Sequence, residues 1–246
     1  MVNPVCSVTQ MVRGLSLEET LPRANWLKVP FAVMRDVGPA VQTLAGVIEV
    51  VNMQWDRPQT FMSVEKIAAA SMLPARTARK HLNTLCVRGW LKNWGREKPR
   101  KARRRRRTCT YEVVAKTKKA AEDSYGVLPK WAAARDMSWC SKAVLSVVMH
   151  GLLYCEAIAR KQTADLYDVV LNYDVDRRFQ LSLQRLSEIT GLSPRSALTG
   201  KNELRRLGII TVDPMVRDRG GLDIDYLRPS EEFRAPIGCL MEAQGS

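Results

Sequence analysis

Hydrophobic residues recur at helical spacing between residues 63 and 91, in two runs that a short break separates. The first run follows Ser63, a residue type that favours helix N-termini because its hydroxyl accepts a hydrogen bond from a free backbone N–H. Val64, Ile67 and Ala68 then fall on one face of a helix. The pattern predicts a short amphipathic helix that ends at the break.

The second run predicts a longer helix with two unlike faces. Ala78, Leu82 and Leu85 recur at i, i+4 and i+7, the spacing of a buried stripe, while cationic and polar residues occupy another face. Pro74 suits the first turn of this helix, because proline lacks an N–H that a helix start leaves free. Gly89 suits its end. Two short helices joined by a tight turn are typical of a helix-turn-helix.

The same pattern occurs twice in the chain. Residues 182–210 align with residues 63–91 without a gap, and seven of the 29 aligned positions are identical. The identical pairs are Ser63/Ser182, Leu73/Leu192, Arg76/Arg195, Ala78/Ala197, Asn83/Asn202, Leu85/Leu204 and Gly89/Gly208. In the second copy Ser193 and Pro194 are expected to begin the second helix. Gly200 is expected to interrupt it, at a cost of about 1 kcal/mol relative to alanine.

Each copy needs a further helix to cover the apolar face of its helix pair. Residues 39–54 supply one before the first copy, and residues 142–161 supply one before the second. With a strand after each pair, these elements predict a mainly α fold with small β wings, built as two tandem winged helix-turn-helix domains. The expected division is an N-terminal extension at 1–25, a first domain at 26–115, a linker at 116–126, a second domain at 127–230 and a C-terminal tail at 231–246.

A basic run lies between the two strands that are expected to form the first wing, at 90–94 and 108–114. Eight of the ten residues from 98 to 107 are lysine or arginine. Hairpin loops usually have about 2–5 residues, so a longer one indicates a function. We favour a wing that clamps DNA, and the alternatives are a targeting or RNA-binding segment and a solvated loop. The residues expected to contact DNA are Lys98, Arg100, Lys101, Arg103, Arg104, Arg105, Arg106 and Arg107.

The net positive charge of the chain comes from its first half. The 246 residues carry a net charge of +14, and 46% of them are hydrophobic, enough for folded cores. Residues 1–120 hold 23 Lys and Arg against 8 Asp and Glu, whereas residues 121–246 hold 16 against 17. A polyanionic partner for the first half is the expectation that follows.

The two predicted recognition helices carry the candidate base contacts. In the first, arginine suits guanine, because it can bridge O6 and N7 in the major groove, and lysine suits guanine or phosphate. The alternative is a solvated basic helix face. The second helix is a weaker candidate for DNA binding, and its residues suit protein contacts as well as DNA contacts. The candidates are Arg76, Thr77, Arg79, Lys80 and Asn83 in the first helix, and Arg195, Ser196, Thr199 and Asn202 in the second.

The sequence has no constellation typical of catalysis or metal binding. Its two histidines, His81 and His150, lie far apart, and its six cysteines include no Cys-x-x-Cys pair. We therefore expect a protein that is not an enzyme, with no catalytic residue, metal or cofactor. It has neither a secretion signal nor an apolar span of about 20 residues, so we expect no membrane partner and a cytoplasmic, nucleoid-associated location.

Residues 63–91 resemble the helix-turn-helix segment of plasmid and phage replication initiators and of related winged-helix regulators. Two such segments in one chain are similar to the architecture of iteron-binding plasmid initiators. The resemblance implies a replication initiator of a plasmid or mobile element, which binds double-stranded DNA as a homodimer or a DNA-assembled oligomer and contacts a replicative helicase. The alternatives are a winged-helix transcriptional regulator and a protein-interaction scaffold. The chain departs from the pattern at Met72, where glycine is usual, and at Lys201, where leucine is expected.

Overall fold

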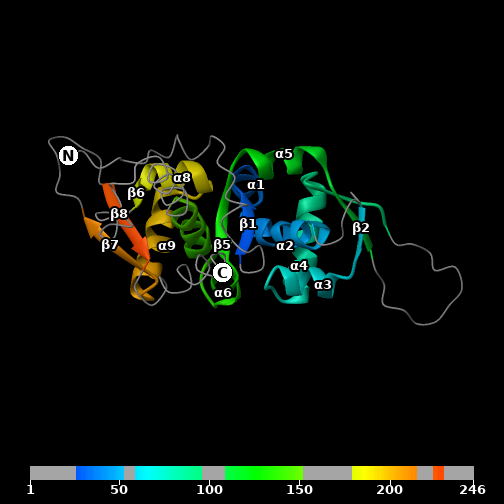
Figure 1. Ribbon diagram of the computed structural model, residues 1–246, viewed down its shortest axis with the longest axis horizontal. Coiled ribbons are helices and arrows are strands. Elements are labelled where there is room, and N and C mark those ends of the chain that lie inside the picture. The colour runs from blue at the N-terminus through cyan, green and yellow to red at the C-terminus, as the bar shows by residue number, and fades with distance from the viewer. Residues whose placement is uncertain (1–25, 53–58, 96–108, 152–178, 215–223, 230–246) are drawn as a thin grey trace, which may run out of the picture. The chain divides into compact units, whose positions relative to one another are not determined.

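The computed structural model describes residues 26–52, 59–95, 109–151, 179–214 and 224–229, which form helices and small antiparallel sheets (Figure 1). The chain divides into two units, one of residues 26–137 and one whose described part begins at Ser138. The first unit contains β1 (Trp26–Pro30), α1 (Phe31–Val37), α2 (Ala40–Asn52), β2 (Gln59–Met62), α3 (Val64–Ala70), α4 (Ala75–Val87), β3 (Leu91–Asn93), β4 (Cys109–Val113), α5 (Ala115–Asp123), β5 (Tyr125–Pro129) and α6 (Lys130–Ala134). The second contains a helix from residue 139, described as far as residue 151, then β6 (Phe179–Ser182), α8 (Leu183–Thr190), α9 (Pro194–Arg206), β7 (Ile210–Pro214) and β8 (Ile224–Pro229).

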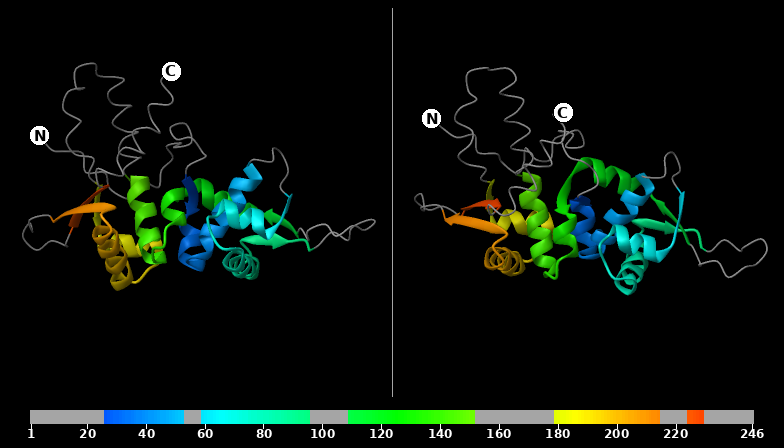
Figure 2. Two further views of the ribbon diagram at one scale, coloured as in Figure 1. Left: turned by 90° about the horizontal axis from the view of Figure 1, so that it is seen from below. Right: turned by 60° about the horizontal axis from the view of Figure 1, so that its bottom comes forward.

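The core of the first unit lies where α2, α3 and α4 pack against one another (Figure 2). Leu44 of α2, Ile67 of α3 and Leu85 of α4 are all buried there. The helices take these positions because each presents an apolar stripe that only the other two can cover. Beside them lies a three-stranded antiparallel sheet in the order β2-β4-β3, with β4 in the middle.

The turn between α3 and α4 is fixed by polar contacts. Ser63 caps α3 by accepting a hydrogen bond from the Lys66 backbone N–H at 3.2 Å. The buried Gln42 side chain of α2 donates to the carbonyl oxygen of Ser71 in the turn, at 2.8 Å. Met72 then takes a φ of 54°, in the left-handed region that glycine adopts without steric cost. The turn thus has at Met72 a backbone geometry that usually favours glycine.

A second, two-stranded sheet extends the first unit beyond the expected domain. β1 pairs with β5 in antiparallel register from Trp26 opposite Pro129 to Pro30 opposite Tyr125. α5 connects β4 to this sheet, and α5 contacts α1 as well. The expected linker at 116–126 is therefore wrong, because these residues form α5 and the start of β5 and pack into the first unit. The boundary between the units falls after Met137.

The second unit repeats the order of elements seen from α2 to β4. Its sheet has the order β6-β8-β7, which matches β2-β4-β3 strand for strand. Ser182 caps α8 as Ser63 caps α3, and Ser193 caps α9 with Pro194 at its first position. Gly191, aligned with Met72, has a φ of 72°. The repeat predicted from the sequence is thus present in the described elements.

The coarse fold class is confirmed, because the chain is mainly helical with small antiparallel sheets. The strands expected at 90–94 and 108–114 are β3 and β4, whereas β2 and β6 were not expected. Pro74 precedes α4 as its N-cap and does not lie in its first turn. The expected N-terminal extension, the C-terminal tail and the basic run at 98–107 lie outside the described residues. Within the described ranges, no helix is both long and apolar enough to cross a membrane.

Candidate nucleic-acid interface

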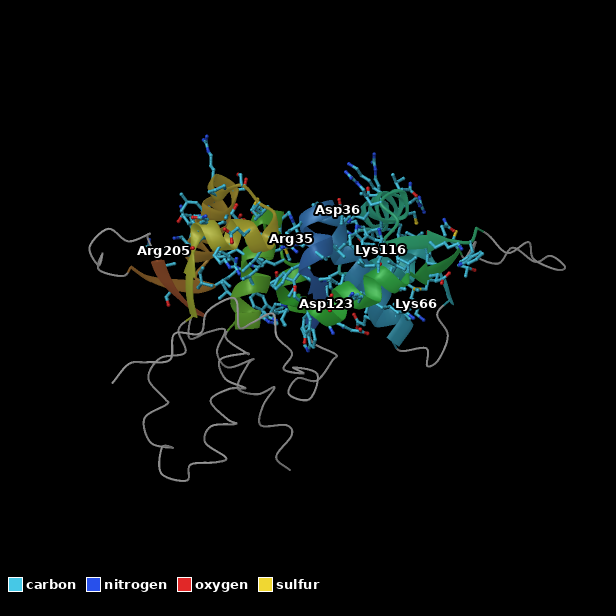
Figure 3. All side chains as sticks on the ribbon, turned by 90° about the horizontal axis from the view of Figure 1, so that it is seen from above. Arg35, Asp36, Lys66, Lys116, Asp123 and Arg205 are labelled. Atoms are coloured by element: carbon cyan, nitrogen blue, oxygen red, sulfur yellow. The ribbon has the colours of Figure 1, made fainter. Side chains whose placement is uncertain are left out.

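α4 has one buried face and one exposed cationic face, as its sequence pattern predicts. Ala78, Leu82 and Leu85 are buried against α2 and α3. Figure 3 shows long, nitrogen-tipped side chains that project outward from this helix. Of the candidate base contacts in α4, Thr77 is half-buried and the others, Arg76, Arg79, Lys80 and Asn83, are exposed. The helix thus presents two arginines and a lysine within two turns, on the side that no element of the core covers.

The C-terminal end of α4 is held by a cluster of side chains from α1 and α5. The Trp90 Nε1–H donates to Asp36 Oδ2 at 2.6 Å, and Arg88 forms an ion pair with the same carboxylate at 3.6 Å. From α5, Lys116 donates to the Arg88 carbonyl oxygen at 3.1 Å and lies 4.3 Å from the Trp90 ring centroid. Thr117 donates to the Trp90 carbonyl oxygen at 2.6 Å. Asp36 and Lys116 are labelled in Figure 3.

These contacts attach the C-terminal end of α4 to α1 and α5. A lysine at a helix C-terminus also stabilises the helix, because it lies at the negative end of the helix dipole. Sequence reasoning missed this cluster. Its members come from three separate segments, so no local spacing in the sequence indicates it.

His81 has a structural role on the flank of α4. Its Nδ1 lies 2.9 Å from the Thr43 hydroxyl oxygen of α2. Burial, and then the nearby positive charge of Lys80, lower the pKa of His81 below its usual value, so the ring is neutral at pH 7. Nowhere in the described parts of the chain do three or more His, Cys, Asp or Glu side chains gather in a way that would hold a metal ion.

The Cys86 thiol, near the β3–β4 hairpin, is not an activated nucleophile. Cys86 of α4 and Cys109 of β4 are half-buried and free. Burial raises the pKa of the Cys86 thiol, which keeps it protonated. Burial, followed by the neighbouring Cys109 and Cys86, raises the pKa of Tyr111 to about 12. The Cys86 thiol and the Tyr111 hydroxyl are therefore uncharged at neutral pH.

The hairpin of β3 and β4 leads into the basic run. Beyond the strands, the Trp94 backbone N–H donates to the Thr110 carbonyl oxygen at 3.0 Å, and the Thr110 N–H donates to Gly95 at 3.2 Å. The paired backbone therefore carries the chain to Gly95, three residues before Lys98. All the expected contacts from Lys98 to Arg107 lie outside the described residues.

α9 exposes fewer cationic side chains in its first two turns than α4 does. Ala197 and Leu204 are buried, and so is Lys201, which takes the position of Leu82 in the repeat. Thr199 donates its hydroxyl proton to the Arg195 carbonyl oxygen at 2.9 Å, so part of its hydrogen-bonding capacity is used inside the helix. Of the candidate contacts, Ser196 is half-buried and Arg195, Thr199 and Asn202 are exposed.

Gly200 does not interrupt α9, contrary to the expectation from its low helix propensity. The helix runs unbroken from Pro194 to Arg206. A Cβ atom at position 200 would lie 2.6 Å from the backbone carbon and oxygen of Cys140, at the start of the helix from residue 139. The glycine is there because two helix backbones approach closely.

Glu203, one turn further along α9, strengthens the same contact. Its carboxylate accepts hydrogen bonds from the Ser138 hydroxyl at 2.5 Å, from the Ser141 hydroxyl at 2.6 Å and from the Ser138 backbone N–H at 3.2 Å. These bonds, the one from the Ser138 side chain first, lower the pKa of Glu203. The carboxylate thus caps the N-terminal end of the neighbouring helix, where negative charge is stabilised.

We expect Gly200→Ala to destabilise the protein, although the same change in an exposed helix stabilises by up to about 1 kcal/mol. The added methyl group overlaps main-chain atoms that cannot rotate away, and overpacking typically costs about 1–3 kcal/mol. Urea denaturation monitored by circular dichroism measures the effect. The comparison variant is Ala197→Gly, which makes the reverse substitution at another position of the same helix. Increased stability of Gly200→Ala would contradict the close packing.

No family model, no curated protein and no solved structure matches this chain. The function of the exposed face of α4 therefore rests on the residues that form it.

Proposed function

We propose that the chain is a sequence-specific, double-stranded DNA-binding protein built from two winged helix-turn-helix domains. In each unit a helix, a strand, two helices and two strands follow one another, and the last strand lies in the middle of the sheet. A winged helix-turn-helix has this order, with the second helix of the pair as the recognition helix. The assignment makes α4 and α9 the two recognition helices.

The observation that carries the proposal is the exposed cationic face of α4. A recognition helix needs a buried side that docks it and a free side that carries guanine-binding and adenine-binding groups. Arg76, Arg79 and Lys80 supply the first kind of group, and Asn83 supplies the second. This face belongs to the second helix of a helix-turn-helix pair, and a basic run follows the adjoining strand β3 in the sequence; a merely solvated basic face would need neither. We therefore favour base contacts over solvation.

The basic run extends this surface along the DNA backbone. In a winged helix the loop after β3 reaches the phosphates or the minor groove beside the recognition helix. The arginines from Arg103 to Arg107 suit both targets. Each can neutralise a phosphate, and arginine is attracted to the negative potential that a narrow minor groove concentrates. Sequence reading is thus assigned to α4 and most of the electrostatic affinity to the wing.

Within this function we favour replication initiation for a plasmid or mobile element. The support is the resemblance of residues 63–91 and the tandem arrangement, in which the second unit is free to contact a second half-site, another copy of the chain or a helicase. A transcriptional regulator is the second candidate, and it would normally use a dimerisation helix or an effector pocket. A protein-interaction scaffold is the third, and the strongly basic first half argues against it.

Sequencing the DNA that is crosslinked to the protein in its host tests this role. Initiation predicts enrichment of one locus that contains an array of repeated sites. A regulator predicts dispersed sites that overlap promoters, and a scaffold predicts no enrichment over the input DNA. The reads therefore distinguish all three roles in one experiment.

A further inference from the structure

Trp94 is an exposed aromatic residue that the proposed duplex contacts leave unused. It directly follows β3, and 52% of its surface is accessible to solvent. Large exposed apolar groups are normal when they are scattered, but a tryptophan that is held in place beside cations suits a binding contact. Trp94 lies next to Lys92, and the basic run begins four residues further along the sequence.

Two neighbours on the same sheet hold the Trp94 ring. The indole Nε1–H donates to Glu112 Oε2 at 2.6 Å, and the Lys92 ammonium lies 3.6 Å from the ring centroid. Lys92 and Glu112 are opposite each other in the β3–β4 register. The ring is thus fixed before any ligand arrives, which reduces the side-chain entropy lost on binding.

The free part of the indole selects the chemistry of the ligand. Its N–H is already satisfied by Glu112, and Lys92 occupies one side of the ring, so the available surface is apolar and aromatic. Paired bases in a duplex cover one another's faces, whereas an unpaired base offers a face for stacking. The Glu112 carboxylate repels phosphate at the indole edge, and Lys92 attracts it on the other side.

We propose that Lys92, Trp94 and Glu112 form a stacking site for an unpaired nucleobase, with Trp94 under the base and Lys92 beside the adjoining phosphate. The inference rests on the proposed nucleic-acid function and adds single-stranded nucleic acid as a second ligand of the first unit. Glu112 is a positioning residue, because it acts through the indole and not on the base.

The test compares affinities of the full-length protein for a mixed-sequence single-stranded oligonucleotide and for the corresponding duplex, by fluorescence anisotropy. Trp94→Ala should weaken single-strand binding by about 5- to 150-fold, the change that corresponds to ~1–3 kcal/mol per stacked base. Duplex affinity should stay the same. Trp94→Phe should restore most of the loss, whereas Trp94→Leu, which has apolar bulk but no aromatic face, should not. Glu122→Gln changes an exposed side chain of α5, outside the proposed interface, and should change neither affinity.

Four outcomes would overturn the stacking site. Equal losses for single strand and duplex would place Trp94 on the DNA backbone. Unchanged single-strand binding in Trp94→Ala, or full recovery in Trp94→Leu, would remove the aromatic contact. A change of oligomeric state in Trp94→Ala, measured by light scattering, would assign the residue to a protein interface. If the protein bound no duplex but lost single-strand affinity in Trp94→Ala, the proposed function would fail while this inference stood.

Discussion

Replacing Arg103 to Arg107 by glycine and serine will lower the affinity for duplex DNA on every sequence and weaken its dependence on salt. Each phosphate that a cation neutralises releases condensed counterions and adds about −0.9 to the slope of log K against log salt concentration. If about three of the five arginines contact phosphate, the slope will flatten by roughly 2.7. The loss will be largest at low salt and will shrink as salt weakens binding by the parent protein. A titration over several salt concentrations, on cognate and random duplexes, measures the effect.

Two controls separate this loss from a folding defect and from a general loss of charge. The thermal unfolding midpoint should not change, because the backbone pairing described for the hairpin, which includes Gly95 and Thr110, involves none of these arginines. Lys118→Ala with Lys119→Ala removes exposed cations from α5, outside the proposed interface, and should leave the slope nearly unchanged. An unchanged slope and affinity in the arginine variant would show that the run serves targeting or RNA binding and is not a DNA clamp.

Arg76→Ala and Arg79→Ala will reduce the preference for the cognate sequence rather than affinity for DNA in general. A lost bidentate contact to guanine should cost about 1–3 kcal/mol at the cognate site, for each arginine that makes one. The random duplex offers no matching base, so its affinity should fall much less. Both side chains are exposed and the buried stripe of α4 is untouched, so the fold should remain intact. Competition between cognate and random duplexes gives the ratio directly.

The control for these variants is Lys66→Ala, which removes an exposed cation from α3, the helix before the turn. If Lys66 contacts phosphate, both affinities should fall together and their ratio should be preserved. Equal losses on the cognate and random duplexes for Arg76→Ala and Arg79→Ala would assign both residues to phosphate contacts. Base reading by this face of α4 would then be wrong.

The sequence predicts the elements whose signals are local. The stripe that contains Ala78 and Leu85, and the serine caps at Ser63 and Ser182, depend on spacings of a few residues, and the structure has each of them. Helical periodicity and capping chemistry act within one or two turns of chain, so one sequence is enough to find them. The candidate contacts of α4 follow from the same pattern, because the residues that do not point inward must point outward.

The parts that the sequence does not predict depend on distant contacts. β1 and β5 are short strands about 100 residues apart, and only their pairing makes them strands and draws α5 into the first unit. The role of Gly200 likewise depends on the backbone of Cys140 in another helix. Local propensity predicts that Gly200 interrupts the helix, because glycine is costly in a helix. It does not register a close neighbour that leaves no room for a Cβ atom. The cluster around Asp36 unites three separate segments and has no spacing signal.

Selection from a pool of random-sequence duplexes tests the central claim, that this chain reads a DNA sequence, most directly. The full-length protein is mixed with the pool at moderate salt, and bound DNA is recovered, amplified and sequenced over several rounds. We predict that one motif becomes enriched and binds about 10³-fold or more tightly than random duplex, and that the enrichment is lost when Arg76 and Arg79 are both replaced by alanine. A pool that stays random while the protein binds all duplexes with equal affinity would contradict the claim.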